Sequence, residues 1–308
     1  MSKWQGALLS NYNAEALLKR SISFIIIFAC LFIFLVPLPI QALGVAQVDQ
    51  AKVRLIIPPG GTKTGTINID NPTQVAKSIK VYLEDWVYLL TGEGTKDFKS
   101  AGTTELSAAP WISFSPTEFT LPPFSRQVLN YTVKVPNEVK GGHYAVMFFE
   151  NYVGNTDKDA ADGVNVNFAI RVASLFYIEA EGTIRREATL DEFEVSNDSS
   201  DNLNISVKLN NVGNVDISAK STYFILDKSG AVQARGEFND AYAFPGNSVV
   251  LVSSWKNKIT EGKYDLVLTI DIGRALEELG LGRGPVITKE AKIDIGPDGR
   301  IISIGELR

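Results

Sequence analysis

Two Gly-x-Tyr triplets, each opening a strongly apolar segment, constrain the fold of this chain more than any other feature. The triplet at residues 142–144 leads into Ala-Val-Met-Phe-Phe, and the triplet at residues 262–264 leads into Asp-Leu-Val-Leu-Thr-Ile. Some tens of residues before each triplet, a strand-like segment ends in an Asn-rich turn, at residues 67–72 and 207–214. A strand, an Asn turn, a long middle and a Gly-x-Tyr strand, present twice, predict one β-module used in tandem.

Alternation of apolar and polar residues, which is typical of strands with one buried face, dominates the chain after its first fifty residues. Each half contains about seven such segments separated by turn signals, the number expected of a β-sandwich. Helical periodicity is confined to residues 274–279, and the polar, Gly-rich residues 90–109 predict a mobile connection. We therefore predict an all-β chain with two tandem immunoglobulin-like β-sandwich domains, at residues 47–181 and 182–308.

The first 46 residues have the features of a secretory signal peptide. Basic residues precede an apolar run at residues 22–36, Pro37 ends the run, and small residues lead up to Ala46. The run is shorter than the ~20 residues that a membrane-spanning helix needs. We expect a signal peptide over residues 1–46, with an uncleaved anchor as the alternative. The single cysteine, Cys30, lies in this leader, so we expect no disulfide in the exported part, which would reach the periplasm or the cell surface.

Composition argues against several classes of function. The formal net charge is −5 and no basic stripe stands out, so nucleic acid is not an expected partner and a membrane is expected only through the leader. The one histidine, His143, is expected to be exposed at the start of a strand, and no second histidine or exported cysteine could join it in a metal site or a nucleophile pair. We predict a protein without catalytic residues, metal or cofactor.

Two further polar features have structural explanations. Glu84 and Asp85 are neighbours on a predicted strand, where they face opposite sides, so we expect them to flank a sheet edge. The acidic residues 157–163 do not match the spacing of an EF-hand and are expected to form a solvated loop.

The two tyrosines of the triplets, Tyr144 and Tyr264, also have a structural explanation. A tyrosine near the start of the penultimate strand of a sandwich often hydrogen-bonds back across the corner before it. We expect this role for both, with ordinary packing as the alternative.

The cleanest alternation in the chain lies at residues 164–172. Its apolar row is formed by Val164, Val166, Phe168 and Ile170, and the opposite face is polar, with Asn167 and Arg171 among its residues. The row either faces the core of its own domain or is offered to a partner.

The first module resembles the N-terminal domain of the PapD-like periplasmic pilus chaperones. The resemblance covers most of residues 50–180 and is carried by Thr-Ile-Asn-Ile-Asp-Asn-Pro at 66–72, Trp-Ile-Ser-Phe-Ser-Pro at 111–116, Leu-Pro-Pro at 121–123, and the segments 142–150 and 168–177. It implies that the row from Val164 to Ile170 is lent to an incomplete secreted subunit, whose fold it completes by strand addition.

The same resemblance implies a pair of basic residues that holds the partner's terminal carboxylate. Arg54 matches the first position. The second position falls on Val172, one residue from Arg171, and a one-residue slip along a strand reverses the face on which the side chain lies.

The second module resembles that of the WxL-interacting bacterial surface proteins, on residues 208–215, 244–246, Trp255 and 262–264. Our preferred hypothesis is an exported, non-enzymatic chaperone or accessory factor for pilus or surface-fibre subunits. The alternative is a structural or adhesive surface protein that binds a cell-wall polymer or a partner protein.

Overall fold

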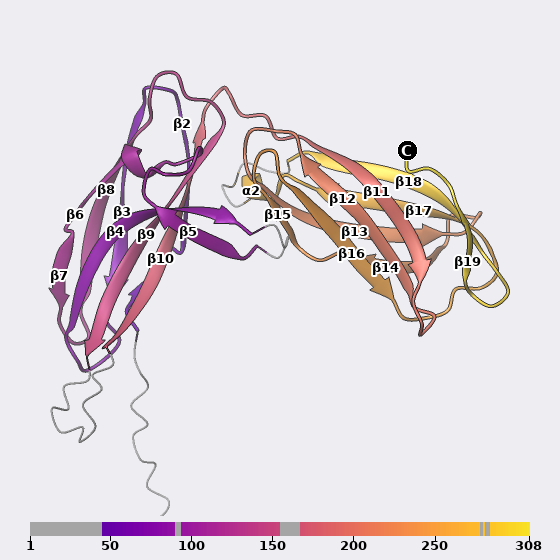
Figure 1. The fold of residues 1–308 in the computed structure, drawn as a ribbon, viewed down its shortest axis with the longest axis horizontal. Helices are drawn as coiled ribbons and strands as arrows, with labels where there is room; N and C mark the ends of the chain where they lie inside the picture. The colour runs from indigo at the N-terminus through magenta and orange to yellow at the C-terminus, as the bar shows by residue number, and fades with distance from the viewer. Residues whose placement is uncertain (1–44, 90–93, 155–166, 278–279, 281–283) are drawn as a thin grey trace, which may run out of the picture. The chain divides into compact units, whose positions relative to one another are not determined.

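The computed structural model describes residues 45–89, 94–154, 167–277, 280 and 284–308. The predicted leader therefore lies almost entirely outside the described residues, as do Val164, Val166 and the acidic residues 157–163. The residues from Val45 to Arg308 form one compact unit. The predicted all-β fold is confirmed: two β-sandwiches follow one another, the first built from β1–β10 and the second from β11–β19 (Figure 1).

The first sandwich packs a four-stranded sheet against a six-stranded one. The four-stranded sheet has the order β1 (Gln47–Val48), β3 (Thr62–Asp70), β8 (Arg126–Lys134) and β6 (Ile112–Ser115). The other has the order β2 (Lys52–Ile57), β10 (Asn167–Ala180), β9 (Gly142–Gly154), β4 (Lys77–Tyr88) and β5 (Lys96–Ser100), with β7 (Glu118–Leu121) beside β4.

Alternation along the strands builds the core of this sandwich. Ile67 and Ile69 of β3 are fully buried, whereas the intervening polar residues point outward. On the other sheet, Phe149 of β9 and Phe176 of β10 belong to the same buried cluster. Burial of each such side chain contributes roughly 1.5–3 kcal/mol, which fixes the register of both sheets because a slip of one residue would expose every one of them.

The second sandwich packs a three-stranded sheet against a six-stranded one. The smaller sheet has the order β11 (Ala188–Asn197), β12 (Leu203–Asn211) and β16 (Ser248–Trp255). The larger has the order β14 (Val232–Glu237), β13 (Ile217–Leu226), β17 (Gly262–Asp271), β18 (Val286–Ile295) and β19 (Ile301–Ile304), with β15 (Ala241–Ala243) beside β13. The predicted helical turn is present as α2 (Arg274–Glu277).

The two Asn-rich turns make equivalent hydrogen bonds in the two sandwiches. The side-chain Nδ2 of Asn71, at the end of the β3 segment, donates to the backbone oxygens of Val75 and Leu121. Asn211, at the end of β12, donates in the same way to the oxygens of Val215 and Ala243. Each asparagine thus satisfies carbonyl groups of a turn and of a distant segment at once, which ties the strand end to the far side of its sandwich.

The segment from residue 94 to residue 109 differs from the predicted mobile connection. It contains β5 and the short 3₁₀-helix η1 (Ala109–Trp111). Between them, the backbone N–H groups of Thr103 and Thr104 donate to the carboxylate of Asp85, and so does the hydroxyl of Ser107. Asp85 is fully buried and does not flank an edge as predicted. The polar composition of this segment suggested mobility. Composition does not show that a single buried carboxylate, that of Asp85, can order a polar loop through charge-assisted hydrogen bonds.

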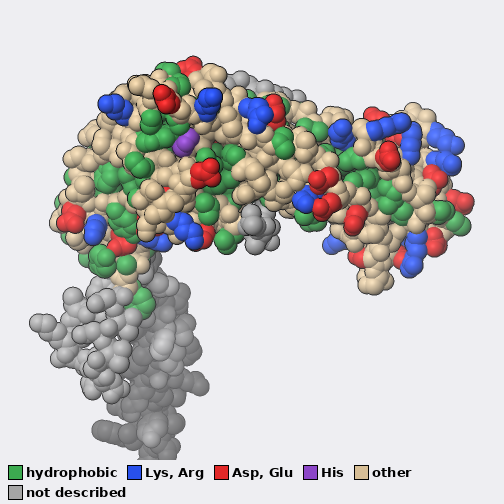
Figure 2. Space-filling view, turned by 45° about the horizontal axis from the view of Figure 1, so that its top comes forward, with side chains coloured by type: hydrophobic (Ala, Val, Ile, Leu, Met, Phe, Trp, Pro, Cys, Tyr) green, Lys and Arg blue, Asp and Glu red, His purple; other side chains and the backbone are tan. Residues whose placement is uncertain are grey.

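Charge is mixed over the surface. Figure 2 shows acidic and basic side chains interspersed on the visible face of both sandwiches. In the described part of the chain, no helix is long and apolar enough to span a membrane. Over the same residues, no three His, Cys, Asp or Glu side chains gather closely enough to hold a metal ion.

Candidate functional site

In its first half, strand β10 pairs with a neighbouring strand along one side only, whereas its second half is paired along both sides. Against β9 the pairing runs from Asn167 to Glu179. On the other side, β2 begins to pair only at Leu175, in parallel register. Strand β1 passes near this edge, but it pairs with β3 in the opposite sheet. Among the residues that the structure describes, no strand pairs with the second side of β10 between Asn167 and Ser174.

The direction of the backbone groups on this open edge follows from their neighbours. The N–H of Leu175 donates to the oxygen of Ala51 on the β2 side, at 2.9 Å, whereas the N–H of Ala180 donates to the oxygen of Gly141 on the β9 side. Because the direction alternates with each residue of a strand, odd-numbered residues face the β2 side. The N–H and C=O groups of Ala169, Arg171 and Ala173 therefore point to the open edge.

Several other edge strands carry features that discourage pairing with a second chain. Strand β6 lies at the edge of its sheet, and Pro110 and Pro116 frame it. Strand β5 carries Lys96, Asp97 and Lys99, and β11 and β19 each contain a register shift. Prolines, charges and bulges all discourage edge-to-edge pairing. Residues 167–174 of β10 contain no proline and one charge, that of Arg171, so this edge remains competent to accept a strand.

The predicted apolar row starts outside the described residues with Val164 and Val166 and continues into β10. Phe168 is 63% exposed, so it does not fill the core of its own sandwich. Ile170 is half-buried. Both lie on the face of the strand that further along carries the fully buried Phe176 and Ile178. The apolar row thus extends beyond the buried core of the sandwich. Its described residues, Phe168 and Ile170, lie beside the open edge.

Arg171 lies on the opposite face and turns inward over the sheet. Its guanidinium carbon is 4.0 Å from the centre of the Phe148 ring, and its Nη1 lies 3.5 Å from Oε1 of Glu84 on β4. Nη1 also donates to the hydroxyl of Tyr82 at 3.4 Å. These contacts carry the charge away from the edge and toward β9 and β4.

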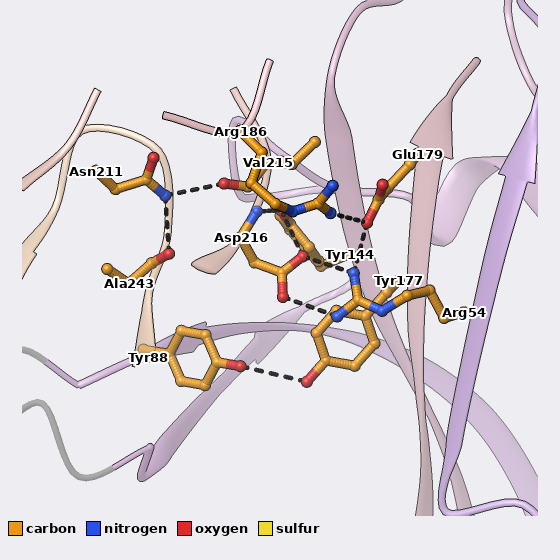
Figure 3. A network of polar contacts seen from close by, with 10 residues as sticks. All are labelled: Arg54, Tyr88, Tyr144, Tyr177, Glu179, Arg186, Asn211, Val215, Asp216 and Ala243. Carbon is orange, nitrogen blue, oxygen red and sulfur yellow. Dashed lines mark hydrogen bonds and ion pairs between the residues drawn. The ribbon is translucent and has the colours of Figure 1, made fainter. Parts of the chain in front are cut away.

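Arg54, the other predicted anchor residue, is buried in a network that joins the two sandwiches (Figure 3). Its Nη1 and Nη2 donate to the two carboxylate oxygens of Asp216, at 2.9 and 2.8 Å. Nη1 also donates to Oε1 of Glu179, which accepts a second bond, at 2.8 Å, from Nη2 of Arg186. Burial alone would lower the pKa of Arg54, but Asp216 and Glu179 together raise it above its ordinary value.

The two predicted anchor residues do not meet in the structure. The Cα partner of Arg54 on β10 is Tyr177, six residues beyond Arg171, which is about 20 Å along a strand. Both arginines, moreover, contact carboxylates of their own chain.

Tyr144 completes the network and corrects a prediction. Its hydroxyl oxygen accepts a hydrogen bond of 2.7 Å from the backbone N–H of Asp216, in the second sandwich, instead of closing a corner of the first. Its ring stacks on Phe244 with centroids 4.1 Å apart. Tyr264 has the predicted role: its hydroxyl donates to the backbone oxygen of Thr260, four residues earlier, at 2.8 Å.

An aromatic cluster surrounds this junction. Trp86, Tyr88 and Tyr177 lie on the outer face of the β4–β9–β10 sheet, and Phe244 of the second sandwich packs among them. These contacts of Phe244 were not predicted from the sequence, where residues 244–246 entered only through the resemblance of the second module. The available signal was the density of large aromatic residues on the outward face of β4, a face that a lone sandwich would expose to water.

His143 is half-buried, not exposed as predicted. Its ring packs against Trp111 with centroids 4.4 Å apart. Burial lowers its pKa to about 4, and its Nδ1 has no hydrogen-bond partner among the described residues. The side chain is therefore neutral at physiological pH and packs against Trp111 near the start of β9.

Comparison with known proteins finds similarity among solved structures alone. No family model and no curated protein matches the chain. Among solved structures, it is similar to the class 5 fimbriae chaperone CfaA, at 15% identity and a TM-score of 0.46, over 80% of this chain and 98% of that one. It is also similar to the periplasmic chaperone SfaE, at 12% identity and a TM-score of 0.36, over 84% and 97% of the two chains.

A third similar structure is the complex of CsuC with the tip subunit CsuE from the archaic chaperone-usher Csu pili of Acinetobacter baumannii. The identity is 11% and the TM-score 0.37, over 80% of this chain and 98% of that one. These three structures are of fimbrial or periplasmic chaperones, the class that the first module resembles in sequence.

Proposed function

We propose that this chain is an exported, non-enzymatic binding protein that takes up an extended segment of another secreted protein along the open edge of β10. The observation that carries the proposal is the unpaired, unguarded backbone of Ala169, Arg171 and Ala173, with the exposed Phe168 beside it. The role that fits this edge is a periplasmic chaperone or accessory factor for pilus or surface-fibre subunits, as the resemblance in sequence implies.

Strand addition divides affinity and specificity between backbone and side chains. Each backbone hydrogen bond that the incoming strand makes to the edge contributes about 0.5–1.5 kcal/mol net. Phe168 and Ile170 offer apolar surface to the partner's core, and the predicted row extends this surface through Val166 and Val164. A subunit that lacks one strand of its own sheet would gain both the hydrogen bonds and the apolar contacts.

The junction between the sandwiches supports the same strand. Glu179 and Tyr177, which contact Arg54, lie on β10 together with Phe168. We propose that the network holds the second half of β10 firmly while the first half receives the partner. An anchor for a terminal carboxylate at Arg54 and Arg171 stays a prediction. Its use would require Arg54 to exchange Asp216 or Glu179 for the partner, and leaving a buried charge without its partner costs several kcal/mol.

Co-purification of envelope proteins with the tagged chain tests the proposal. We expect Phe168→Asp and Ile170→Asp to release a secreted partner that the unchanged chain retains after cross-linking. The matched control is Val128→Asp on β8, because Val128 is 42% exposed in the same sandwich but lies in the other sheet.

Phe168→Asp and Val128→Asp should unfold at the same denaturant concentration as the unchanged chain, whereas Ile170→Asp, at a half-buried position, should unfold at a lower one. A partner that Phe168→Asp and Ile170→Asp retain as well as Val128→Asp does would contradict strand addition at this edge. So would the absence of any secreted partner.

A further inference from the structure

The open edge of β10 has exposed aromatic rings on both faces of the sheet, not on one. On the face of the predicted row, Phe168 is 63% exposed. On the opposite face, Tyr152 of β9 is 61% exposed. Tyr152 is the Cα partner of Ala169, one of the residues of β10 whose backbone groups face the open side.

Tyr152 has a charged neighbour on its face. Its hydroxyl interacts with the carboxylate of Glu150, which lowers the pKa of Glu150 and raises that of Tyr152. Glu150 in turn accepts a bond of 2.6 Å from the hydroxyl of Tyr82. Tyr82 and Tyr152 thus both lie near the Glu150 carboxylate on this face.

Ala169 leaves a gap between Tyr152 and an incoming strand. Strands lie about 4.8 Å apart, so an incoming residue beside Ala169 would stand about 10 Å from Tyr152 at the backbone. The methyl group of Ala169 does not fill this span. Aromatic and long side chains reach neighbours about 7–8 Å away across a sheet, so two large side chains that lean toward each other over Ala169 can meet. An aromatic side chain at this position would thus meet the Tyr152 ring.

Few charges lie on this surface, and the Glu150 carboxylate on β9 already accepts a hydrogen bond from Tyr82. Arg171 is the only charged residue of the edge, and its guanidinium lies over Phe148 and beside Glu84, toward the interior of the sheet. The edge itself presents the methyl groups of Ala169 and Ala173 and the aliphatic stem of Arg171. An uncharged, apolar strand matches it, whereas a charged side chain would lose water without gaining a partner.

We infer that the segment received by β10 is uncharged and apolar on both faces where it lies beside Phe168 and Ala169, with a large apolar or aromatic side chain packed across Ala169 against Tyr152. A strand buried on both faces has a continuous apolar run in its sequence, in contrast to the alternation of a strand buried on one face. The inference rests on the proposed function and adds the composition of the partner segment and a specificity residue, Tyr152.

Three nine-residue peptides, each immobilised through a Gly-Ser tail and measured by biosensor against the full chain, test the inference. All have the sequence Thr-Val-Thr-Val-X-Val-Thr-Val-Thr, where X is Phe, Ser or Lys. We expect the Phe peptide to bind about threefold to tenfold more tightly than the Ser peptide, the range of an aromatic pair, and the Lys peptide to bind most weakly.

Substitutions in the chain separate the contribution of Tyr152 to peptide binding from the contribution of strand addition. Tyr152→Ala should bring the affinity for the Phe peptide down to that for the Ser peptide and leave the Ser peptide unchanged. Tyr152→Phe should keep the preference, because the ring remains. Phe168→Asp should weaken the binding of both the Phe peptide and the Ser peptide.

Each remaining outcome counts against a different claim. Equal affinity for the Phe and Ser peptides, or a preference that survives Tyr152→Ala, overturns the inference and leaves strand addition intact. Failure of all three peptides to bind contradicts strand addition and the inference together. A free chain that sediments as a dimer, and as a monomer after Phe168→Asp, makes a second copy the occupant and also overturns the inference.

Discussion

Tyr144 and Asp216, which belong to different sandwiches, share a hydrogen bond of 2.7 Å between the Tyr144 hydroxyl oxygen and the Asp216 backbone N–H. Tyr264 has the matching position in the second repeat, but its hydroxyl stays within its own sandwich, on Thr260. One repeated motif thus serves two purposes. In the second sandwich it closes a corner, and in the first it joins the sandwiches and brings Asp216 to Arg54.

Loss of the Tyr144 hydroxyl should weaken this junction. Tyr144→Phe keeps the ring on Phe244 but leaves the buried N–H of Asp216 without its acceptor, which costs about 1–3 kcal/mol. Urea unfolding followed by tryptophan fluorescence measures the loss. The control is Tyr264→Phe, which should leave the two sandwiches unfolding together, whereas Tyr144→Phe should begin to separate their transitions. Coincident transitions in both variants would show that the hydroxyl does not couple the sandwiches.

The buried ion pair of Arg54 should matter far more than an exposed one. Asp216→Asn removes one of the two carboxylates that neutralise Arg54 and leaves Glu179 as the other. Breaking a buried ion pair typically lowers the free energy of unfolding by about 3–5 kcal/mol. Arg126 and Asp70 form a similar two-bonded pair on the surface, with nitrogen–oxygen distances of 2.7 and 2.8 Å. Asp70→Asn should therefore change the free energy of unfolding by less than about 1 kcal/mol. Equal losses for the two variants would argue against the network as the main polar contact of the junction.

His143 should make stability fall in mild acid. Its pKa is about 4 in the folded chain, because burial disfavours the charged ring, against 6.5 when exposed. The unfolded chain therefore binds the proton more readily, and the stability that is fully present above pH 6.5 is lost as pH falls from 6.5 to 4. Allowing for solvent around a half-buried ring, the loss is about 1–2 kcal/mol. Urea midpoints across this range should show the slope, and His143→Gln should remove most of it. An unchanged slope in that variant would assign the effect to other groups.

Sequence patterns predicted the strands well where one face of each strand is buried. The alternation in β3 and β12 and the two Asn-rich turns led directly to the two sandwiches, because period-two burial and side-chain capping are local properties. The helical turn at Arg274 was equally local. These features needed no knowledge of which strands meet.

The junction could not be predicted in the same way. Glu179 and Asp216 are far apart in the chain, and Arg54 was interpreted as an anchor for a partner because nothing in the sequence shows that two carboxylates of its own chain surround it. Asp85 was misplaced for a similar reason, since its partners are mostly backbone N–H groups of a polar loop. The open edge of β10 depends on where β2 begins to pair, which the residues of β10 alone do not reveal.

The central claim is that a partner strand pairs with the open side of β10. Residue-by-residue amide hydrogen exchange, with and without the co-purified partner, tests it most directly. In the free chain, the amides of Ala169, Arg171 and Ala173 should exchange fast, while those of Ile170 and Val172, which point toward β9, should already be protected. Binding should protect the first three and change the other two little. Binding that leaves Ala169, Arg171 and Ala173 exchanging as before would contradict the account.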